Sequence, residues 1–297
     1  MAVDYASYER LLQYKIPEVE QTLTARDTML YALGVGLGAD PMDETQLRFV
    51  FEKNLVALPT MAVILAAPHA WIRKTDTGFG TKTVHGEQTL VLHKALPVEG
   101  TLVGVPKLVS VIDKGIENGR NRGAVIATER KVYEKKSGDL LSTLVSTSFC
   151  RDDGGFGGPS GTNGTNGAAR PPHAVPETPP QLTCDLPTLP QAALIYRLSG
   201  DYNVLHADPA HALKVGFPKP ILHGLCTLGV AGHALLKTLC EYEPARFKSM
   251  EVRFSAPVYP GETLRTEMWK NGNVVSFRCV VVERNKVVLN NGRAEIA

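Results

Sequence analysis

A short run in the second half of the chain brings a carboxylate, an amide and an imidazole together. Asp201, Asn203 and His206 follow Ser199-Gly200, a pair that permits a sharp turn. A carboxylate and an imidazole that share one water molecule can divide acid–base work, because one group takes a proton from the water while the other delivers a proton to carbon. The simpler interpretation is an Asx turn at Asp201 beside a structural His206, and the pattern alone leaves both open.

A second candidate group stands at the start of a long apolar stretch, residues 221–239, which predicts a buried helix packed closely against a sheet. The first N–H groups of a helix have no partner inside the helix, and the helix dipole is positive there. Gly224 would let a substrate oxygen approach the backbone, so its N–H is a candidate donor to an oxygen that gains negative charge during a reaction. The alternative is that Gly224 serves packing. His223, taken alone, is interpreted as a structural histidine.

The surrounding elements predict an α+β protein made of two similar halves. In the C-terminal half, Asp208-Pro209 starts a short helix that ends at Gly216, and Asn271-Gly272 marks a two-residue hairpin turn. Strands are expected at 250–258, 263–270, 274–282 and 287–296. The N-terminal half has helical or apolar segments at 26–33 and 58–67, and then strand candidates at 88–94, 101–112, 125–134 and 140–149. Because strands follow helical material in both halves, we predict a duplicated domain.

The stretch between the halves, residues 151–180, is crowded with Gly, Pro, Thr and Asn and has few apolar residues. Such a segment buries too little surface to offset its ordering entropy, so it is predicted to be a loop or linker. The expected organisation is an N-terminal domain at 1–150, the linker at 151–180 and a C-terminal domain at 181–297.

Composition excludes several function classes. The net charge of +2 gives no case for a nucleic-acid or membrane-surface partner, and no apolar run is long enough to span a membrane. The five cysteines are scattered, which argues against a disulfide framework or a zinc knuckle. No group of His, Cys and Glu has metal-ligand spacing along the chain, so we expect neither a metal nor a cofactor. The ends carry no secretory signal and no S-K-L-type peroxisomal address.

Taken together, the motifs resemble the MaoC-like family of (3R)-specific 2-enoyl-CoA hydratases (hydratase 2), and most closely the hydratase units of peroxisomal multifunctional enzymes type 2. The run from Tyr196 to His206, followed by PILHGLC, carries the main resemblance. Further matches cover nearly the whole chain: Met29–Gly36, Leu58–Thr60, His85–Gln88, Asp113–Gly115, Gly154–Gly158, Pro257–Gly261 and Thr266–Lys270.

The resemblance implies a double hot-dog fold, in which an antiparallel sheet in each half wraps a long helix. It implies reversible addition of water to trans-2-enoyl-CoA, with CoA as part of the substrate, and a homodimer. The N-terminal half has Asp27 but no histidine five residues later, so one active site per chain is expected, with room for a long or branched acyl tail in that half. The family's home in eukaryotes is the peroxisome; otherwise the chain is expected in the cytoplasm.

The resemblance also assigns roles to residues. Asp201 and His206 are the acid–base pair, Asn203 orients water or the loop, and Gly224 donates its N–H to the thioester oxygen. Residues expected along the CoA or acyl path are His85, Gly86, Lys114, Tyr202, Val204, Leu205 and Phe254. Supporting residues are Arg197, Glu52, Tyr31 and His223. Val204 replaces the proline usual in the family, and because valine is β-branched and stiff, we expect the turn geometry to survive.

Three other functions remain open at this point. A hot-dog thioesterase would hydrolyse acyl-CoA with a carboxylate and water, without needing the Asp/His pair across an alkene. A non-catalytic acyl-CoA-binding protein would not need Asp201 or His206. A dehydratase acting on another carrier-bound acyl group would use the same residues.

Overall fold

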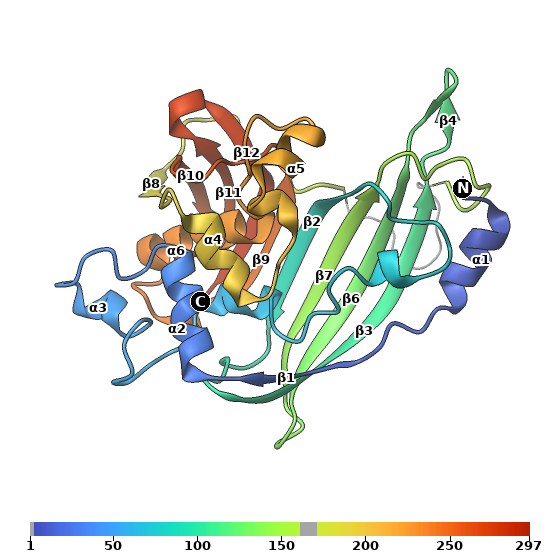
Figure 1. Cartoon of the computed structure of the whole chain (residues 1–297). Helices are drawn as coiled ribbons and strands as arrows, with labels where there is room; N and C mark the ends of the chain where they lie inside the picture. The colour runs from blue at the N-terminus through green and yellow to red at the C-terminus, as the bar shows by residue number, and fades with distance from the viewer. Residues whose placement is uncertain (1–2, 161–170) are drawn as a thin grey trace.

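Ten antiparallel strands form one continuous sheet across the protein (Figure 1). The structure is a computed structural model that describes residues 3–160 and 171–297. From one edge to the other the strands are β1 (Val19–Leu23), β3 (Gly100–Asp113), β6 (Ala124–Glu134), β7 (Leu140–Cys150), β2 (Thr83–Leu92), β9 (Phe247–Phe254), β12 (Lys286–Ile296), β11 (Val274–Val281), β10 (Thr263–Asn271) and β8 (Leu182–Pro187).

The two halves of this sheet have the same topology. From edge to centre the N-terminal half runs β1, β3, β6, β7, β2, and the C-terminal half runs β8, β10, β11, β12, β9. The central strands β2 and β9 pair antiparallel, with Glu87 opposite Arg253 and Val91 opposite Ser249. A small ribbon, β4 (Ile116–Glu117) and β5 (Arg120–Asn121), extends from the N-terminal half. The predicted duplication and the α+β double hot-dog fold are therefore confirmed.

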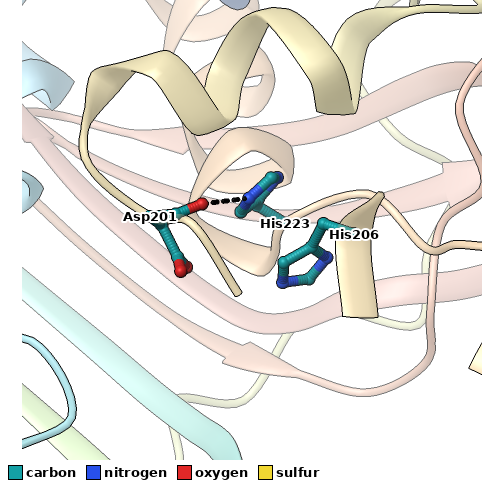
Figure 2. Close-up of side chains that lie close together, drawn as sticks. All are labelled: Asp201, His206 and His223. Atoms are coloured by element: carbon teal, nitrogen blue, oxygen red, sulfur yellow. Dashed lines mark hydrogen bonds between the residues drawn. The ribbon is translucent and has the colours of Figure 1, made fainter. Parts of the chain in front are cut away.

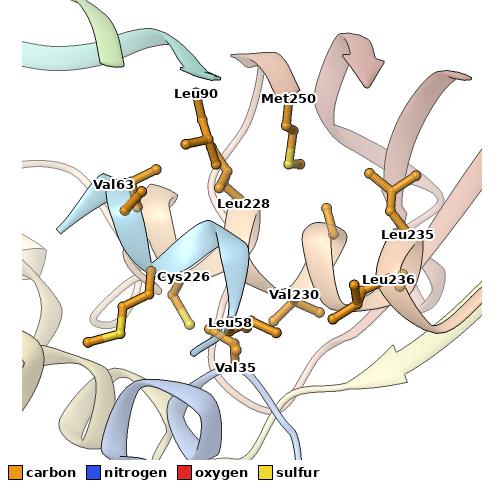
Figure 3. Packing of buried hydrophobic residues seen from close by; sticks show 14 of the residues in the cluster. Val35, Leu58, Val63, Leu90, Cys226, Leu228, Val230, Leu235, Leu236 and Met250 are labelled. Carbon is orange, nitrogen blue, oxygen red and sulfur yellow. The ribbon is translucent and has the colours of Figure 1, made fainter. Parts of the chain in front are cut away.

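The long helix of the C-terminal half, α6 (Gly224–Leu239), is buried along most of its length. Its small residues permit close approach, since a Cβ atom at Gly232 would lie 2.2 Å from Thr60 Cγ2. Figure 3 shows Leu58 and Val63 of the N-terminal half in the same apolar cluster as Leu228 of α6. Both halves therefore share one core.

The N-terminal half lacks the long helix that the resemblance implies. Residues 58–67 instead contain a 3-10 helix, η1 (Pro59–Val63). Arg130 Nη2 donates a hydrogen bond to the carbonyl oxygen of Val63 at 2.8 Å, and Ala66 has a left-handed φ of 46°. The acceptor that a further helical turn would use is thus engaged, and the backbone turns away at Ala66.

The shorter elements sit at the edges and around the site. They are α1 (Tyr5–Gln13), α2 (Ala25–Gly34), α3 (Glu44–Leu47), η2 (Trp71–Lys74), α4 (Ala192–Tyr196), η3 (Arg197–Ser199), η4 (Val204–His206), α5 (Pro209–Lys214), η5 (Pro244–Arg246) and η6 (Val282–Arg284). The predicted start of α5 is confirmed, because the Asp208 side chain accepts the N–H of Ala210 at 2.8 Å.

The first part of the predicted linker packs against the N-terminal half. Phe156 is buried in a second apolar cluster, and the Asp113 carboxylate accepts the N–H groups of Gly155 and Gly157 at 2.7 and 2.9 Å. Residues 151–160 are therefore a held loop and not a free connection, because the glycines let the backbone reach a buried carboxylate. Residues 161–170 of the predicted linker lie outside the described residues.

Candidate active site

Asp201 and Asn203 each form an Asx turn directly before His206. Asp201 Oδ1 accepts the N–H of Asn203 at 3.1 Å, and Asn203 Oδ1 accepts the N–H of Leu205 at 3.1 Å. Gly200 precedes them with φ 118°, a conformation that favours glycine. The simpler interpretation of the sequence is thus right as well, since the same turns give Asp201 and His206 their positions.

His206 is buried, and its ring orientation is fixed by one hydrogen bond. Its Nδ1 lies 2.8 Å from the carbonyl oxygen of Ile221, which requires Nδ1 to carry the proton. Burial lowers the pKa of His206, against the raising effects of the Ile221 bond and the Asp201 charge. At neutral pH the ring is therefore neutral, with Nε2 as a proton acceptor. Val204, at the family's proline position, begins η4 without disturbing this arrangement.

His223 contacts both His206 and Asp201. Its ring stacks on His206 with 3.7 Å between ring centroids and 29° between the planes, and its Nε2 lies 3.1 Å from the backbone oxygen of Asp201. In Figure 2 the Asp201 carboxyl group and the His206 ring both lie below His223. Burial, followed by the His206 charge, lowers the pKa of His223 to about 4. A structural role for His223 fits these contacts.

These three residues form a group that spacing along the chain does not reveal. One ligand-type atom each of Asp201, His206 and His223 lies within 4.8 Å of the others, although these residues do not have metal-ligand spacing along the chain. The rings of His206 and His223 are stacked, with 29° between their planes. Each ring also engages a backbone carbonyl. The arrangement suits a pair that handles protons better than it suits a tetrahedral metal.

Gly224 at the start of α6, with Phe254 of β9 and His85 of β2, forms the rest of the site. No acceptor among the described residues takes the N–H of Gly224. A Cβ atom at Gly224 would lie 3.2 Å from Phe254 Cε1, and the Phe254 ring lies 4.6 Å from that of His85. Phe254 ends β9 and His85 lies on β2, so both halves form this wall. Burial lowers the pKa of His85 to about 4, against the charge of Asp201.

The other residues expected along the CoA or acyl path are Gly86, Tyr202, Leu205 and Lys114. Gly86 forms a bulge in β2, where a Cβ atom would lie 2.9 Å from Thr147 Oγ1. Tyr202 is exposed beside Arg197, whose guanidinium carbon lies 4.9 Å from its ring centroid, and Leu205 is half-buried. Lys114 is exposed, between the end of β3 and the start of β4.

The supporting residues differ in what the structure shows for them. Tyr31 is buried, and its ring lies 5.9 Å from that of Tyr196 at the end of α4, so it packs against the helix that precedes the Gly200–Asp201 turn. Arg197 contributes a positive charge that lowers the pKa values of His206 and His223 as the smallest of the causes. Glu52 is exposed, and no hydrogen bond or ion pair joins it to another described residue.

The N-terminal counterpart of Asp201 is Gly36. The equivalent helices α2 and α4 each carry a tyrosine, Tyr31 and Tyr196, and both Gly36 and Asp201 stand five residues later. Asp27 accepts the N–H of Thr24 at 3.0 Å and caps α2, so its carboxylate serves the start of this helix. The N-terminal half has Gly36, and no carboxylate, at the position equivalent to Asp201, which supports a single site per chain.

Sequence reasoning missed His69. A Cβ atom at Gly200 would lie 3.4 Å from His69 Nε2, so this residue of the N-terminal half is a neighbour of the Gly200–Asp201 turn. No motif surrounds it, and only the fold brings it to Asp201.

Among the described residues, two matched five-stranded halves, with Asp201 and His206 close together near the start of one long helix, define a double hot-dog protein. Residues 22–152 match the family model of the MFE-2 hydratase 2 N-terminal domain, and residues 171–291 match that of the MaoC like domain. The chain belongs to the MaoC-like hydratase 2 family.

Similar proteins cover almost the whole chain. An Arabidopsis thaliana protein named enoyl-CoA hydratase 2, peroxisomal, is 39% identical over 94% of this chain and 92% of its own length. The peroxisomal multifunctional enzyme type 2 of Mus musculus is 38% identical over 95% of this chain, which spans only 38% of that enzyme. The crystal structure of a MaoC-like dehydratase from Phytophthora capsici superposes with a TM-score of 0.81 at 33% identity, covering 98% of each chain.

Proposed function

We propose that the protein is a (3R)-specific enoyl-CoA hydratase that adds water reversibly to trans-2-enoyl-CoA thioesters in fatty-acid β-oxidation or related acyl-CoA metabolism. The observation that carries this function is the proximity of the Asp201 carboxylate and the His206 ring, within 4.8 Å, next to the Gly224 N–H at the start of α6. The names of the family relatives support the same reaction.

The chemistry follows from the protonation states of these groups. Asp201 and the neutral His206 share one water molecule, whose hydroxyl adds to carbon 3 of the substrate. A proton passes through the pair to carbon 2, so the pair returns to its starting state and no electron acceptor is needed. Charge that develops on the thioester oxygen is stabilised by the N–H of Gly224 and the positive end of α6.

The other residues expected at the site are proposed to contact the substrate. His85, Gly86 and Phe254 line the approach to the thioester from the junction of β2 and β9, and Tyr202, Val204 and Leu205 lie beside it. Lys114 meets a phosphate of CoA as a flexible point charge. The acid–base pair itself needs neither metal nor cofactor.

A paired assay tests this function against a thioesterase and a non-catalytic binder. Crotonyl-CoA and butyryl-CoA are supplied separately, with hydration followed by loss of enoyl absorbance and hydrolysis followed by a thiol reagent. We expect hydration of crotonyl-CoA to the (3R) product, shown by chiral analysis, and no thiol release. Hydrolysis of butyryl-CoA, or binding without turnover, would overturn the proposal. A chain-length series of 2-enoyl-CoA thioesters then defines the acyl preference, and the matching acyl-carrier-protein substrates test the dehydratase alternative.

We also propose a homodimer, as the family resemblance implies. The strands β2 and β9, which would be open edges of separate halves, pair with each other inside the chain. Support comes instead from apolar side chains exposed over 194–215, namely Leu194, Leu198, Val204, Leu213 and Val215. Apolar patches of this kind mark interfaces. Light scattering should give twice the chain mass of 32.2 kDa, and Leu213→Glu should shift it towards the monomer. A fully active wild-type monomer would contradict this.

Among the described residues, none of the helices has the length and apolar character needed to cross a bilayer. We propose a peroxisomal location in a eukaryotic cell, on the strength of the relatives' names, and a cytoplasmic one otherwise. Organelle fractionation with the enoyl-CoA hydration assay tests this location.

A further inference from the structure

His223, the residue directly before α6, contacts both members of the acid–base pair. Its Nε2 lies 3.1 Å from the backbone oxygen of Asp201, so Nε2 carries a proton and donates this hydrogen bond. Its ring stacks on the ring of His206, with 3.7 Å between the ring centroids and 29° between the planes. The dashed line in Figure 2 joins His223 to the backbone of Asp201, and the His206 ring lies beside it. One side chain thus connects Asp201 with His206.

The hydrogen bond from His223 connects Asp201 to the start of α6. Among the described residues, it is the one hydrogen bond that reaches Asp201 from outside its own turn, since the other joins Asp201 Oδ1 to the N–H of Asn203. Gly200, directly before Asp201, has a φ of 118° and no side chain that could anchor the turn. The bond from His223 is therefore the restraint that ties this turn to the long helix.

Residues 221–224 also provide the other contacts of the site. The carbonyl oxygen of Ile221 accepts a hydrogen bond from His206 Nδ1 at 2.8 Å. Gly224, the first residue of α6, provides the N–H that is proposed to meet the thioester oxygen. One short segment therefore places the imidazole, the carboxylate and the N–H donor relative to one another.

The ring of His223 has a fixed place in the protein. It is buried, and the ring of Tyr196 lies 5.1 Å from it. The N–H of Leu222 donates to the carbonyl oxygen of Val258 at 2.7 Å, which anchors the backbone next to His223. Burial, followed by the charge of His206, lowers the pKa of His223 to about 4. The ring is therefore neutral at pH 7, so its stack with His206 is free of repulsion between two cations.

We propose that His223 is a positioning residue that keeps the Asp201 carboxylate and the His206 ring at a fixed separation, and both in a fixed relation to the Gly224 N–H. The inference rests on the proposed hydratase function. His223 acts through its two neighbours and exchanges no proton with the substrate. Because displacement of a catalytic group by about 1 Å can cost ~10²-fold in rate, removal of this restraint should be visible in kcat.

Steady-state kinetics on crotonyl-CoA separate the hydrogen bond of His223 from its ring contact. His223→Ala removes both and should lower kcat by about 10²-fold, with little change in KM because the residues that contact the substrate remain. His223→Gln places an amide N–H at a reach similar to that of Nε2 and should recover most of the lost rate. His223→Phe keeps a ring that can stack but has no donor, so it should recover little.

The matched control is His233→Ala in the same helix. His233 is also buried, and its ring nitrogens lie 3.3 Å from the carbonyl oxygen of Val35 and 3.1 Å from Tyr242 Oη. This variant should lower the melting temperature and keep kcat per folded molecule. A His223→Ala variant with the same kcat per folded molecule as the control would overturn the proposal. Equal rates for His223→Gln and His223→Phe would overturn it too, and this comparison does not need the alanine variant to fold.

Crystal structures of the wild type and of His223→Phe test the positioning without an activity assay. The separation of the Asp201 carboxylate from the His206 ring should differ by about 1 Å between the two, and an unchanged separation would overturn the proposal. In an Asp201→Asn background, His223→Phe should lower kcat little further, because it acts through Asp201, whereas fully additive losses would contradict the proposal. A wild-type protein inactive on crotonyl-CoA would instead overturn the proposed function.

Discussion

Gly224→Ala separates the N–H donor role of the first residue of α6 from its packing role. The added Cβ atom would lie 3.2 Å from Phe254 Cε1 and 3.3 Å from Cδ1, so the ring must retreat by a few tenths of an ångström while it packs on His85. The effect on stability is small, because the ring has to move only slightly and Gly224, the first residue of α6, has no left-handed φ that would strain an alanine. The methyl group also crowds the space from which the thioester oxygen meets the N–H.

Removal of one oxyanion donor lowers kcat by ~10²–10³-fold, so partial displacement is expected to cost about 10–10²-fold. Initial rates on crotonyl-CoA and thermal melts measure the two effects separately. The matched control is Gly232→Ala in the same helix, whose Cβ atom would lie 2.2 Å from Thr60 Cγ2, away from the site. That variant should lose stability by ~1–3 kcal/mol and keep its kcat per folded molecule. A near-wild-type kcat for Gly224→Ala would refute the donor role.

Three further predictions follow from charges in and around the site. Burial lowers the pKa values of His85, His223 and His233 to about 4, so the unfolded chain binds more protons below about pH 6.5, and melting temperature should fall from pH 7 to pH 5; a rise would contradict the sign. Exhaustive chelation should leave kcat unchanged, and a loss restored by zinc or magnesium would exclude the proposed chemistry. Lys114→Ala should raise KM for crotonyl-CoA but not for a pantetheine thioester, whereas equal KM changes would remove Lys114 from the phosphate site.

One hairpin turn and one helix start, which depend on residues close together in the sequence, were predicted correctly. The hairpin at Asn271-Gly272 joins β10 and β11 as predicted, and Asp208-Pro209 starts α5. The edge strands β1 and β8 were not predicted, because their short segments are set by pairing with β3 and β10 far along the chain. The short η1 was not predicted either, since the interaction that ends it comes from Arg130 on β6.

In the candidate site too, residues in local turns could be predicted, whereas contacts between distant segments could not. Asp201, Asn203 and His206 could be proposed from spacing, because two consecutive Asx turns are local structures. His85 and Phe254 came only from the family resemblance, since the pairing of β2 with β9 that joins them is non-local. Physical reasoning from sequence had no means to find the stacking of His206 on His223, because it depends on the tertiary fold.

The central claim is that Asp201 and His206 act together on one water molecule, and kcat on crotonyl-CoA for Asp201→Asn, His206→Gln and the double variant tests it most directly. Each single change should lower kcat by at least ~10²-fold, with little change in KM or melting temperature. The double change should cost little more than the worse single change, because members of a catalytic unit are not additive. A folded His206→Gln variant with near-wild-type kcat would contradict the claim.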